Sequence, residues 1–313
     1  MEREDNPLKV KGSDNFISPI RMMLVGFENE DPATQKKLPV DADVVELCCE
    51  WGLLVTATAK DRRTGDLILI AFYYLLRVGE YTCRWRKKRP RRTKKTVNFR
   101  LCDVAFFKKN EEGILQRLSP NVEPAARLQA DGATLRLTNQ KNGWKNVCVH
   151  QQKNKHGKWC PVRALARVVN DLLTFTRDGE EYLSAFKNEK GEIQQVIPGD
   201  ITKMLKAAAK EKEYPELRGC PLERIDTHSL RSGGANALSL AGYEEFQIQK
   251  MGRWNSRTFK EYISDQLSNF SEGMSEAMSK TFNFVNIAAG GWQTDVFDKT
   301  IASEYEPELC EEE

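Results

Sequence analysis

One stretch of the sequence, residues 226–263, constrains the fold more than any other. It predicts a helix over residues 228–241, with Thr227 as its N-cap and a glycine after its last turn. His228 and Arg231 stand at positions i and i+3, so they share one face near the start of this helix. A helix N-terminus offers unpaired N–H groups and the positive end of the helix dipole, so this face is typical of an anion site.

Two shorter helical segments follow, on either side of a tight turn. Residues 244–251 favour a short helix, which the turn Gly-Arg-Trp-Asn-Ser at residues 252–256 interrupts. A last short helix then carries Tyr262. The side chains that the first of these helices is expected to bury at least partly are Phe246, Ile248 and Met251. Together these features indicate a phosphate site with a phenol nearby.

The spacing of the polar residues in this stretch resembles that of a known enzyme family. His228-Ser-Leu-Arg231, then Gly252-Arg253, then Tyr262 nine residues after Arg253, is similar to the carboxyl-terminal signature of tyrosine recombinases, or phage integrases. The sequences HSLRSGGANAL and GRWNSRTFKEYI are especially similar to those of recombinases from eukaryotic mobile elements of the Crypton and DIRS type. His-x-x-Arg alone is a weak signal, but the correctly spaced tyrosine makes it fairly specific. The resemblance implies two further site residues upstream.

An apolar run supplies the first of these two residues. Residues 67–76 predict a buried helix that starts after a break at Thr64-Gly65 and is too short to span a bilayer. Arg77 and Glu80 follow it directly, and charges in such a place cost energy unless each has a partner. One interpretation is an ordinary ion pair at a helix end. The resemblance implies instead that Arg77 holds the scissile phosphate and that Glu80 supports the fold around it.

A predicted β-hairpin over residues 134–149 supplies the second. Its Asn142-Gly143 pair is the strongest short hairpin signal, because both turn positions favour positive φ. Lys141 lies beside this turn, where a lysine is ordinarily just exposed, and Lys145 competes with it. The resemblance implies that Lys141 reaches the cleavage site and protonates the leaving 5′ oxygen.

The most basic run of the chain occupies residues 84–95. Such a run is usually a solvated face, and it is also typical of a nuclear import signal or a nucleic-acid-binding patch. Its position soon after Arg77 favours contact with the DNA backbone, because phosphate neutralisation supplies most non-specific affinity. The predicted DNA-binding residues are Arg84, Arg86, Lys87, Lys88, Arg89, Arg91 and Arg92.

Several function classes are not expected from this sequence. His150, His156 and Cys160 would supply only three ligands, so we expect no metal site, and the resemblance implies no cofactor. The eight cysteines form no C-x-x-C pair, and adjacent Cys48 and Cys49 are interpreted as packing residues in a reducing compartment. No long apolar run or secretory signal is present, so a membrane is not an expected partner.

The predicted fold class is α+β, mostly helical with a small antiparallel sheet, as the resemblance to the recombinase catalytic domain implies. Further helices are predicted over residues 42–51 and 162–175. We expect an irregular lead-in over residues 1–38, the catalytic domain over 39–270, and a helix with an acidic tail over 271–313. The family usually has a helical core-binding domain before the catalytic one, so the resemblance suggests that it is missing or truncated in this chain.

The resemblance also implies a mechanism, that of a site-specific DNA recombinase or integrase with a 3′-phosphotyrosyl intermediate and no metal. Arg77 and Arg231 would hold the two non-bridging oxygens of a phosphodiester. Tyr262 would attack the phosphorus, and His228 would manage the proton of the phenol. The expected partner is double-stranded DNA, with a homo-oligomer assembled on it. The expected compartment is the nucleus in a eukaryote and otherwise the cytoplasm.

One position departs from the family pattern. Arg253 stands where the family usually has His or Trp, and Trp254 is one residue away from that place. Both residues therefore remain candidates for a phosphate contact.

Three alternatives stay open. A non-catalytic DNA-binding protein derived from a recombinase would keep these residues but would form no covalent adduct with DNA. A type IB topoisomerase would use the same chemistry to relax any supercoiled plasmid without site preference. A helical protein-interaction module would explain the apolar stripes, but it leaves the ordered series of site residues as a coincidence.

Overall fold

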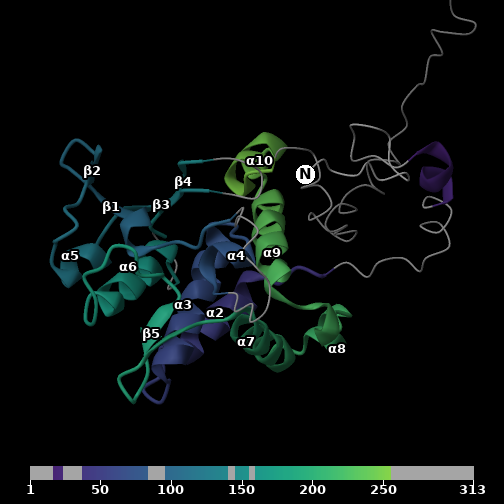
Figure 1. The fold of residues 1–313 in the computed structure, drawn as a ribbon, viewed down its shortest axis with the longest axis horizontal. Coiled ribbons are helices and arrows are strands. Elements are labelled where there is room, and N and C mark those ends of the chain that lie inside the picture. The colour runs from purple at the N-terminus through teal and green to yellow at the C-terminus, as the bar shows by residue number, and fades with distance from the viewer. Residues whose placement is uncertain (1–16, 24–36, 84–95, 140–144, 155–158, 255–313) are drawn as a thin grey trace, which may run out of the picture. The chain divides into compact units, whose positions relative to one another are not determined.

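The computed structural model describes residues 17–23, 37–83, 96–139, 145–154 and 159–254 (Figure 1). The elements before helix α6 are α2 (Ala42–Gly52), α3 (Ala59–Tyr73), α4 (Val78–Tyr81), η1 (Leu101–Asp103), β1 (Val104–Lys109), β2 (Leu115–Arg117), α5 (Pro124–Leu128), β3 (Gly132–Leu137) and β4 (Val147–Gln152). Those that follow are α6 (Pro161–Leu172), β5 (Ala185–Lys187), β6 (Ile193–Gln195), α7 (Pro198–Glu211), α8 (Tyr214–Arg218), η2 (Leu222–Arg224), α9 (Thr227–Leu240) and α10 (Glu245–Gly252). Residues 18–23 are also helical.

Two antiparallel sheets accompany the helices in the described part of the chain. The larger one has the order β2-β1-β3-β4, and β5 pairs with β6 in a separate hairpin. β3 and β4 pair from Gly132 opposite Gln152 to Leu137 opposite Val147, which confirms the hairpin predicted over residues 134–149. The predicted Asn142-Gly143 turn lies outside the described residues. A mostly helical α+β fold with a small antiparallel sheet is therefore confirmed.

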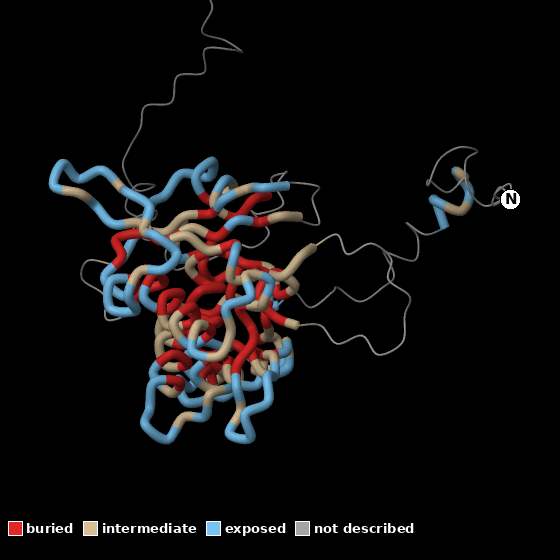
Figure 2. Tube along the Cα trace, turned by 60° about the vertical axis from the view of Figure 1, so that its left-hand side comes forward, coloured by how far each residue is buried: buried red, intermediate tan, exposed pale blue. Residues whose placement is uncertain are grey.

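Helix α3 lies at the centre of the helical part and contacts α2, α6, α7 and α9 (Figure 1). Its residues 63–72 are all buried, and buried residues continue through the neighbouring helices (Figure 2). Because α3 is surrounded on all sides, its residues 67–72 carry no polar side chain, and the buried charges of Arg63 and Asp66 before them are paired. None of the helices in the described ranges is long and apolar enough to cross a membrane.

The predicted break at Thr64-Gly65 is wrong, because α3 runs through both residues. A Cβ built on Gly65 would lie 2.7 Å from the carbonyl oxygen of Cys48, so the glycine allows α2 and α3 to approach closely. The predicted packing role of Cys48 and Cys49 is confirmed, since both are buried free thiols on α2. The glycine marks a close helix crossing instead of a helix end.

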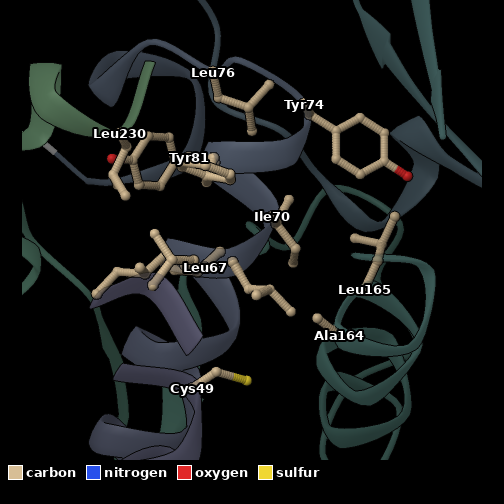
Figure 3. Packing of buried hydrophobic residues seen from close by; sticks show 14 of the residues in the cluster. Cys49, Leu67, Ile70, Tyr74, Leu76, Tyr81, Ala164, Leu165 and Leu230 are labelled. Carbon is tan, nitrogen blue, oxygen red and sulfur yellow. The ribbon is translucent and has the colours of Figure 1, made fainter. Parts of the chain in front are cut away.

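Two tyrosines fix the chain where it leaves α3 (Figure 3). Tyr74 is buried and donates its hydroxyl to the carbonyl oxygen of Ala133 on β3 at 2.9 Å. Tyr81 is buried as well, in the same apolar cluster as Leu230 of α9 (Figure 3). The segment between these two tyrosines is thus held between the sheet and α9. This segment carries Arg77 and Glu80.

Three further details differ from the sequence predictions. Asp226, not Thr227, is the N-cap of α9, and its Oδ1 accepts from the backbone N–H of His228 at 2.7 Å. Phe246 is 63 % exposed instead of partly buried, and the Lys250 ammonium lies 5.4 Å from its ring centroid. The alternating apolar residues of the segment 97–107 predict a strand there, but the strand begins only at Val104, because residues 101–103 form η1. Ile248 is buried as predicted.

A buried carboxylate, that of Asp131, joins β1, β3 and β4 at one end of the larger sheet and makes stability depend on pH. Burial alone would raise the pKa of Asp131, but hydrogen bonds from Lys153 and the Lys109 N–H, with the charges of Lys153 and Lys108, lower it to about 2. Because the pKa of Asp131 is lower in the folded than in the unfolded chain, its carboxylate stabilises the fold at pH values above the ordinary pKa of an aspartate. This stabilisation is lost as the pH falls towards 2.

We expect Asp131→Asn to lower the free energy of unfolding by about 1 kcal/mol at pH 7, since both lysines are half-exposed and solvent screens them. Denaturant titrations of wild type and variant at several pH values measure the difference. It should shrink from pH 4 towards pH 2, whereas Glu189→Gln, at an exposed carboxylate, should have no effect at either pH. A difference that stays constant down to pH 2 would contradict the assignment.

Candidate active site

The site begins where α3 ends. Leu75 has a φ of 50°, in the left-handed region that leucine rarely adopts, and such strain costs about 1–3 kcal/mol. Its carbonyl oxygen accepts hydrogen bonds from Nη1 of Arg231 and from Nη2 of Arg253, the latter at 3.2 Å. Arg231 is 156 residues away from Leu75 in the sequence. One strained carbonyl therefore joins two distant arginines, and these bonds offset part of the strain.

Glu80 is the second element of this arrangement. The residue is 0 % exposed, and its carboxylate accepts from the backbone N–H of Arg77 at 2.8 Å and from Arg77 Nη1 at 3.3 Å. Arg77 is the N-cap of the short helix α4, and its side chain is 21 % exposed. The same carboxylate also accepts from Arg253 Nη2 at 2.9 Å. Glu80 thus holds Arg77 near the surface and Arg253 beneath it.

Arg253 is buried more deeply than a residue at the end of an amphipathic helix would be expected to be. It follows α10 with a φ of 58°, and it is 1 % exposed. Its guanidinium donates to the carbonyl oxygens of Tyr74, Leu75 and Met251 in addition to Glu80. Burial lowers the pKa of Arg253, the Glu80 charge raises it, and the Arg77 charge lowers it.

Arg231 lies on α9 and is only 3 % exposed. Its Nη1 donates to Leu75 and its Nη2 to the carbonyl oxygen of Gly252. The indole of Trp254 lies over the guanidinium, with 4.2 Å between Cζ and the ring centroid. A Cβ on Gly252 would lie 1.5 Å from Cζ3 of Trp254, so this glycine makes room for the stacked ring. All three residues of the Gly-Arg-Trp sequence therefore contribute to the cluster: Gly252 accepts from Arg231 and leaves room for the indole, Arg253 binds Glu80, and Trp254 covers Arg231.

His228 lies one turn before Arg231 and is exposed on the first turn of α9. The Asp226 carboxylate already caps its backbone N–H, so the helix N-terminus is partly satisfied within the protein. The exposed imidazole remains at the same helix end as Arg231, as the spacing predicted.

These side chains together form a positively charged group. Arg77, Arg231 and Arg253 with Glu80 carry a formal charge of +2, three cations less one anion. Arginine presents planar forks of N–H donors that match a phosphate. The structure connects the predicted site residues Arg77, Glu80, Arg231 and Arg253, together with Trp254, through a chain of direct contacts. The arrangement suits the binding of a phosphate at its exposed side, where Arg77 lies.

The other predicted site residues lie outside the described residues. These are Lys141, Tyr262 and the whole basic run, namely Arg84, Arg86, Lys87, Lys88, Arg89, Arg91 and Arg92. Lys145, the competing lysine of the hairpin, is exposed just before β4. The roles proposed for these residues stay predictions.

The histidine considered as a metal ligand has another role in the described part of the chain. His150 lies on β4 opposite Thr134, whose Oγ1 is 2.8 Å from its Nδ1, and its ring meets Phe107 edge-on at 5.7 Å. Within the described ranges no group of three His, Cys, Asp or Glu side chains could hold a metal ion. His156 lies outside these ranges.

Sequence reasoning missed the buried position of Arg253 and the left-handed turn at Leu75. One signal pointed towards the first: Glu80 follows a fully apolar run, and a carboxylate in such a place needs a partner. Nothing in the local sequence identifies which cation that is, since Glu80 and Arg253 are 173 residues apart.

Comparisons with known proteins give structural similarity only. No protein-family model matches the sequence, and no curated protein matches it. Among solved structures, XerA recombinase is similar over 80 % of this chain and 67 % of its own, with 15 % identity and a TM-score of 0.44. The Tn1549 transposon integrase in complex with transposon right end DNA is similar over 80 % of this chain and 69 % of its own, with 16 % identity and a TM-score of 0.39.

A third similar structure is XerH site-specific recombinase bound to difH substrate in a pre-cleavage complex. It is similar over 78 % of this chain and 53 % of its own, with 15 % identity and a TM-score of 0.44. This chain therefore spans about half the length of that recombinase. At these values the similarity assigns neither a family nor an activity to this chain.

Proposed function

We propose that this protein cuts and rejoins DNA strands in the manner of a tyrosine recombinase. The observation that supports the proposal is the convergence of Arg77 and Arg231 on one cluster, through Glu80, Arg253 and the Leu75 carbonyl oxygen. The sequence motifs predict the same pair of arginines independently of the geometry. A cluster with a formal charge of +2 fits a phosphodiester, whose negative charge grows towards a pentacoordinate transition state.

The proposed chemistry proceeds without a cofactor. The Tyr262 oxygen attacks the phosphorus, a 3′-phosphotyrosyl bond forms, and the bond between phosphorus and the 5′ oxygen breaks. His228 accepts the phenol proton, and Lys141 donates a proton to the leaving 5′ oxygen. Because the new phosphodiester keeps the energy of the broken one, the reverse attack rejoins the strand. An unassisted phenol has a pKa near 10, so the cationic cluster is needed to stabilise its anion.

The proposed partner is double-stranded DNA. The basic run at residues 84–95 contacts its backbone, and the enzyme is a recombinase of the kind that Crypton and DIRS mobile elements carry, since its motifs are most similar to theirs. We further propose a homo-oligomer on the DNA and a nuclear location in a eukaryotic host. These features rest on the sequence motifs.

Covalent capture tests the proposal. Nicked duplexes with a randomised centre release a short fragment on cleavage and so trap the protein on DNA as an SDS-resistant adduct. We expect adducts with the wild-type protein. With Arg77→Ala we expect their yield to fall by at least about 10²-fold, the effect of removing one preorganised donor. Arg136→Ala is the matched control, because Arg136 also pairs at 3.3 Å with a buried carboxylate, that of Asp103.

Arg136→Ala should retain adduct formation. Wild-type adduct yield in Arg77→Ala would exclude the role proposed for Arg77. If adducts form and any supercoiled plasmid is relaxed without site preference, the enzyme is of the type IB topoisomerase kind instead.

A second candidate function is that of a non-catalytic DNA-binding protein. One observation favours it: Arg231 is 3 % exposed, with its guanidinium held by two carbonyl oxygens and covered by Trp254. Retained DNA affinity without adducts, in wild type and Tyr262→Phe alike, would support this candidate.

A further inference from the structure

Arg253 has surroundings that do not suit a phosphate ligand. It is 1 % exposed, and its guanidinium is engaged with a carboxylate and with backbone carbonyl oxygens. Arg77, in contrast, reaches the surface while it shares the same carboxylate. A buried arginine in such a place must contribute through its neighbours if it contributes to the chemistry at all.

The first neighbour is Glu80. Its Oε1 accepts from Arg77 Nη1, and its Oε2 accepts from both the Arg77 backbone N–H and Arg253 Nη2. With Arg253 present, the three side chains carry a formal charge of +1. Without it, Glu80 would neutralise Arg77 and be free to rotate towards it. Arg253 therefore fixes the carboxylate and leaves a net positive charge at Arg77.

The second neighbour is the Leu75 carbonyl oxygen. It accepts from Arg253 and Arg231 together, which places Arg253 between the two arginines of the proposed phosphate site. The left-handed φ of 50° at Leu75 directs this carbonyl towards them. One buried guanidinium thus contacts the supports of both Arg77 and Arg231.

We propose that Arg253 is a positioning residue that sets the spacing between Arg77 and Arg231, acting through Glu80 and the Leu75 carbonyl oxygen. The inference rests on the proposed function for the identity of the ligand, a DNA phosphate. It replaces the expectation from sequence that Arg253 itself contacts that phosphate.

A double-mutant cycle on DNA affinity separates the two roles. The variants are Arg77→Ala, Arg253→Met and their combination, and the probe is a fluorescent duplex of mixed sequence at fixed salt. We expect each single change to weaken binding by about 10-fold, the effect of one charge-assisted hydrogen bond. Because part of the effect of Arg253 passes through Arg77, the double variant should lose clearly less affinity than the product of the two single effects. An independent phosphate contact would give the product of the two effects, which would overturn the inference.

The cleavage rate supplies a readout that a merely structural role would not move. At saturating DNA, Arg253→Met should lower the single-turnover rate of adduct formation by about 10²-fold, the cost of a misplaced catalytic group. Arg253→Lys keeps a charge beside Glu80 and should recover part of this rate. The lysine variant also carries the cycle if the methionine variant does not fold.

Arg63→Met is the matched control for lost packing. Arg63 is equally buried, and it donates to the carbonyl oxygens of Leu183 and Ala185 and to Asp171. It lies on α3 about 18 Å from Leu75, at about 1.5 Å per residue. At matched loss of stability it should leave DNA affinity and cleavage unchanged, and an equal loss of both in this control would overturn the inference.

The outcomes also separate this inference from the proposed function. If the double-mutant cycle shows coupling between Arg77 and Arg253 but no adduct forms, the positioning role stands and the proposed strand cleavage is rejected. If wild type forms adducts but the effects of the two substitutions on binding free energy are additive, the positioning role is rejected and the proposed strand cleavage stands.

Discussion

Gly233→Ala should unfold the protein or lower its free energy of unfolding by more than about 4 kcal/mol. A Cβ at this position would lie 2.0 Å from the carbonyl oxygen of Val40 and 3.1 Å from Cε2 of Phe72. The Val40 oxygen belongs to backbone that is itself bonded to α9, since the Val40 N–H donates to Ser229 at 3.2 Å. The Val40 oxygen cannot move away without disturbing this bond, so overpacking here displaces α9, the helix that carries His228 and Arg231.

Gly199→Ala is the control for the same substitution in a helix with space. The atom nearest to a Cβ there is Cδ1 of Ile197 at 3.9 Å. Alanine favours a helix over glycine by up to about 1 kcal/mol, so this variant should be as stable as wild type or slightly more stable. Thermal unfolding followed by circular dichroism compares the two variants. Equal stability of Gly233→Ala and Gly199→Ala would contradict the close crossing of α9 at Val40.

Glu80→Ala should lower the free energy of unfolding by about 3–5 kcal/mol, because it leaves a buried guanidinium without its counter-charge. The affected cation is Arg253, which is 1 % exposed and lies 2.9 Å from the Glu80 carboxylate. The same change removes two acceptors of Arg77, so we also expect loss of DNA cleavage. Chemical denaturation and adduct formation measure the two effects separately.

Asp171→Ala gives the comparison for Glu80→Ala. Asp171 also pairs with a buried arginine, Arg63, but its own side chain is 54 % exposed. Water can replace this carboxylate, so the loss should be about 1 kcal/mol or less. A loss for Glu80→Ala as small as that would show that Arg253 finds another acceptor, and the cluster would then not depend on Glu80.

Local signals in the sequence were sufficient for much of the fold. The helix predicted over residues 42–51 is α2, and the helix predicted over 162–175 is α6, whose buried residues follow the helical period. The helix predicted over 228–241 is α9, and Gly242 follows it with a φ of 80°, the conformation that ends such helices. These features depend on residues near each other in the sequence, and for that reason the sequence predicts them.

Features that depend on distant contacts were not predictable in the same way. Glycine commonly interrupts a helix, yet Gly65 lies inside α3, where it allows close packing against Cys48. Phe246 is a large apolar residue of the kind usually found in a core, yet its side chain on α10 is exposed. Arg253 could be aligned with a catalytic position by spacing alone, whereas its burial depends on the backbone at Tyr74 and Leu75. The motifs indicated Arg77, Arg231 and the supporting role of Glu80, but not the Leu75 carbonyl oxygen or the buried Arg253 that connect them.

The most direct test of strand cleavage is to identify the amino acid that becomes linked to DNA. Adducts captured on the randomised duplexes would be digested with nuclease and trypsin, and the nucleotide-bearing peptide would be sequenced by mass spectrometry. We predict a phosphate-linked nucleotide on Tyr262 and no adduct with Tyr262→Phe. A nucleotide on any other residue, or undiminished adducts with Tyr262→Phe, would contradict the account.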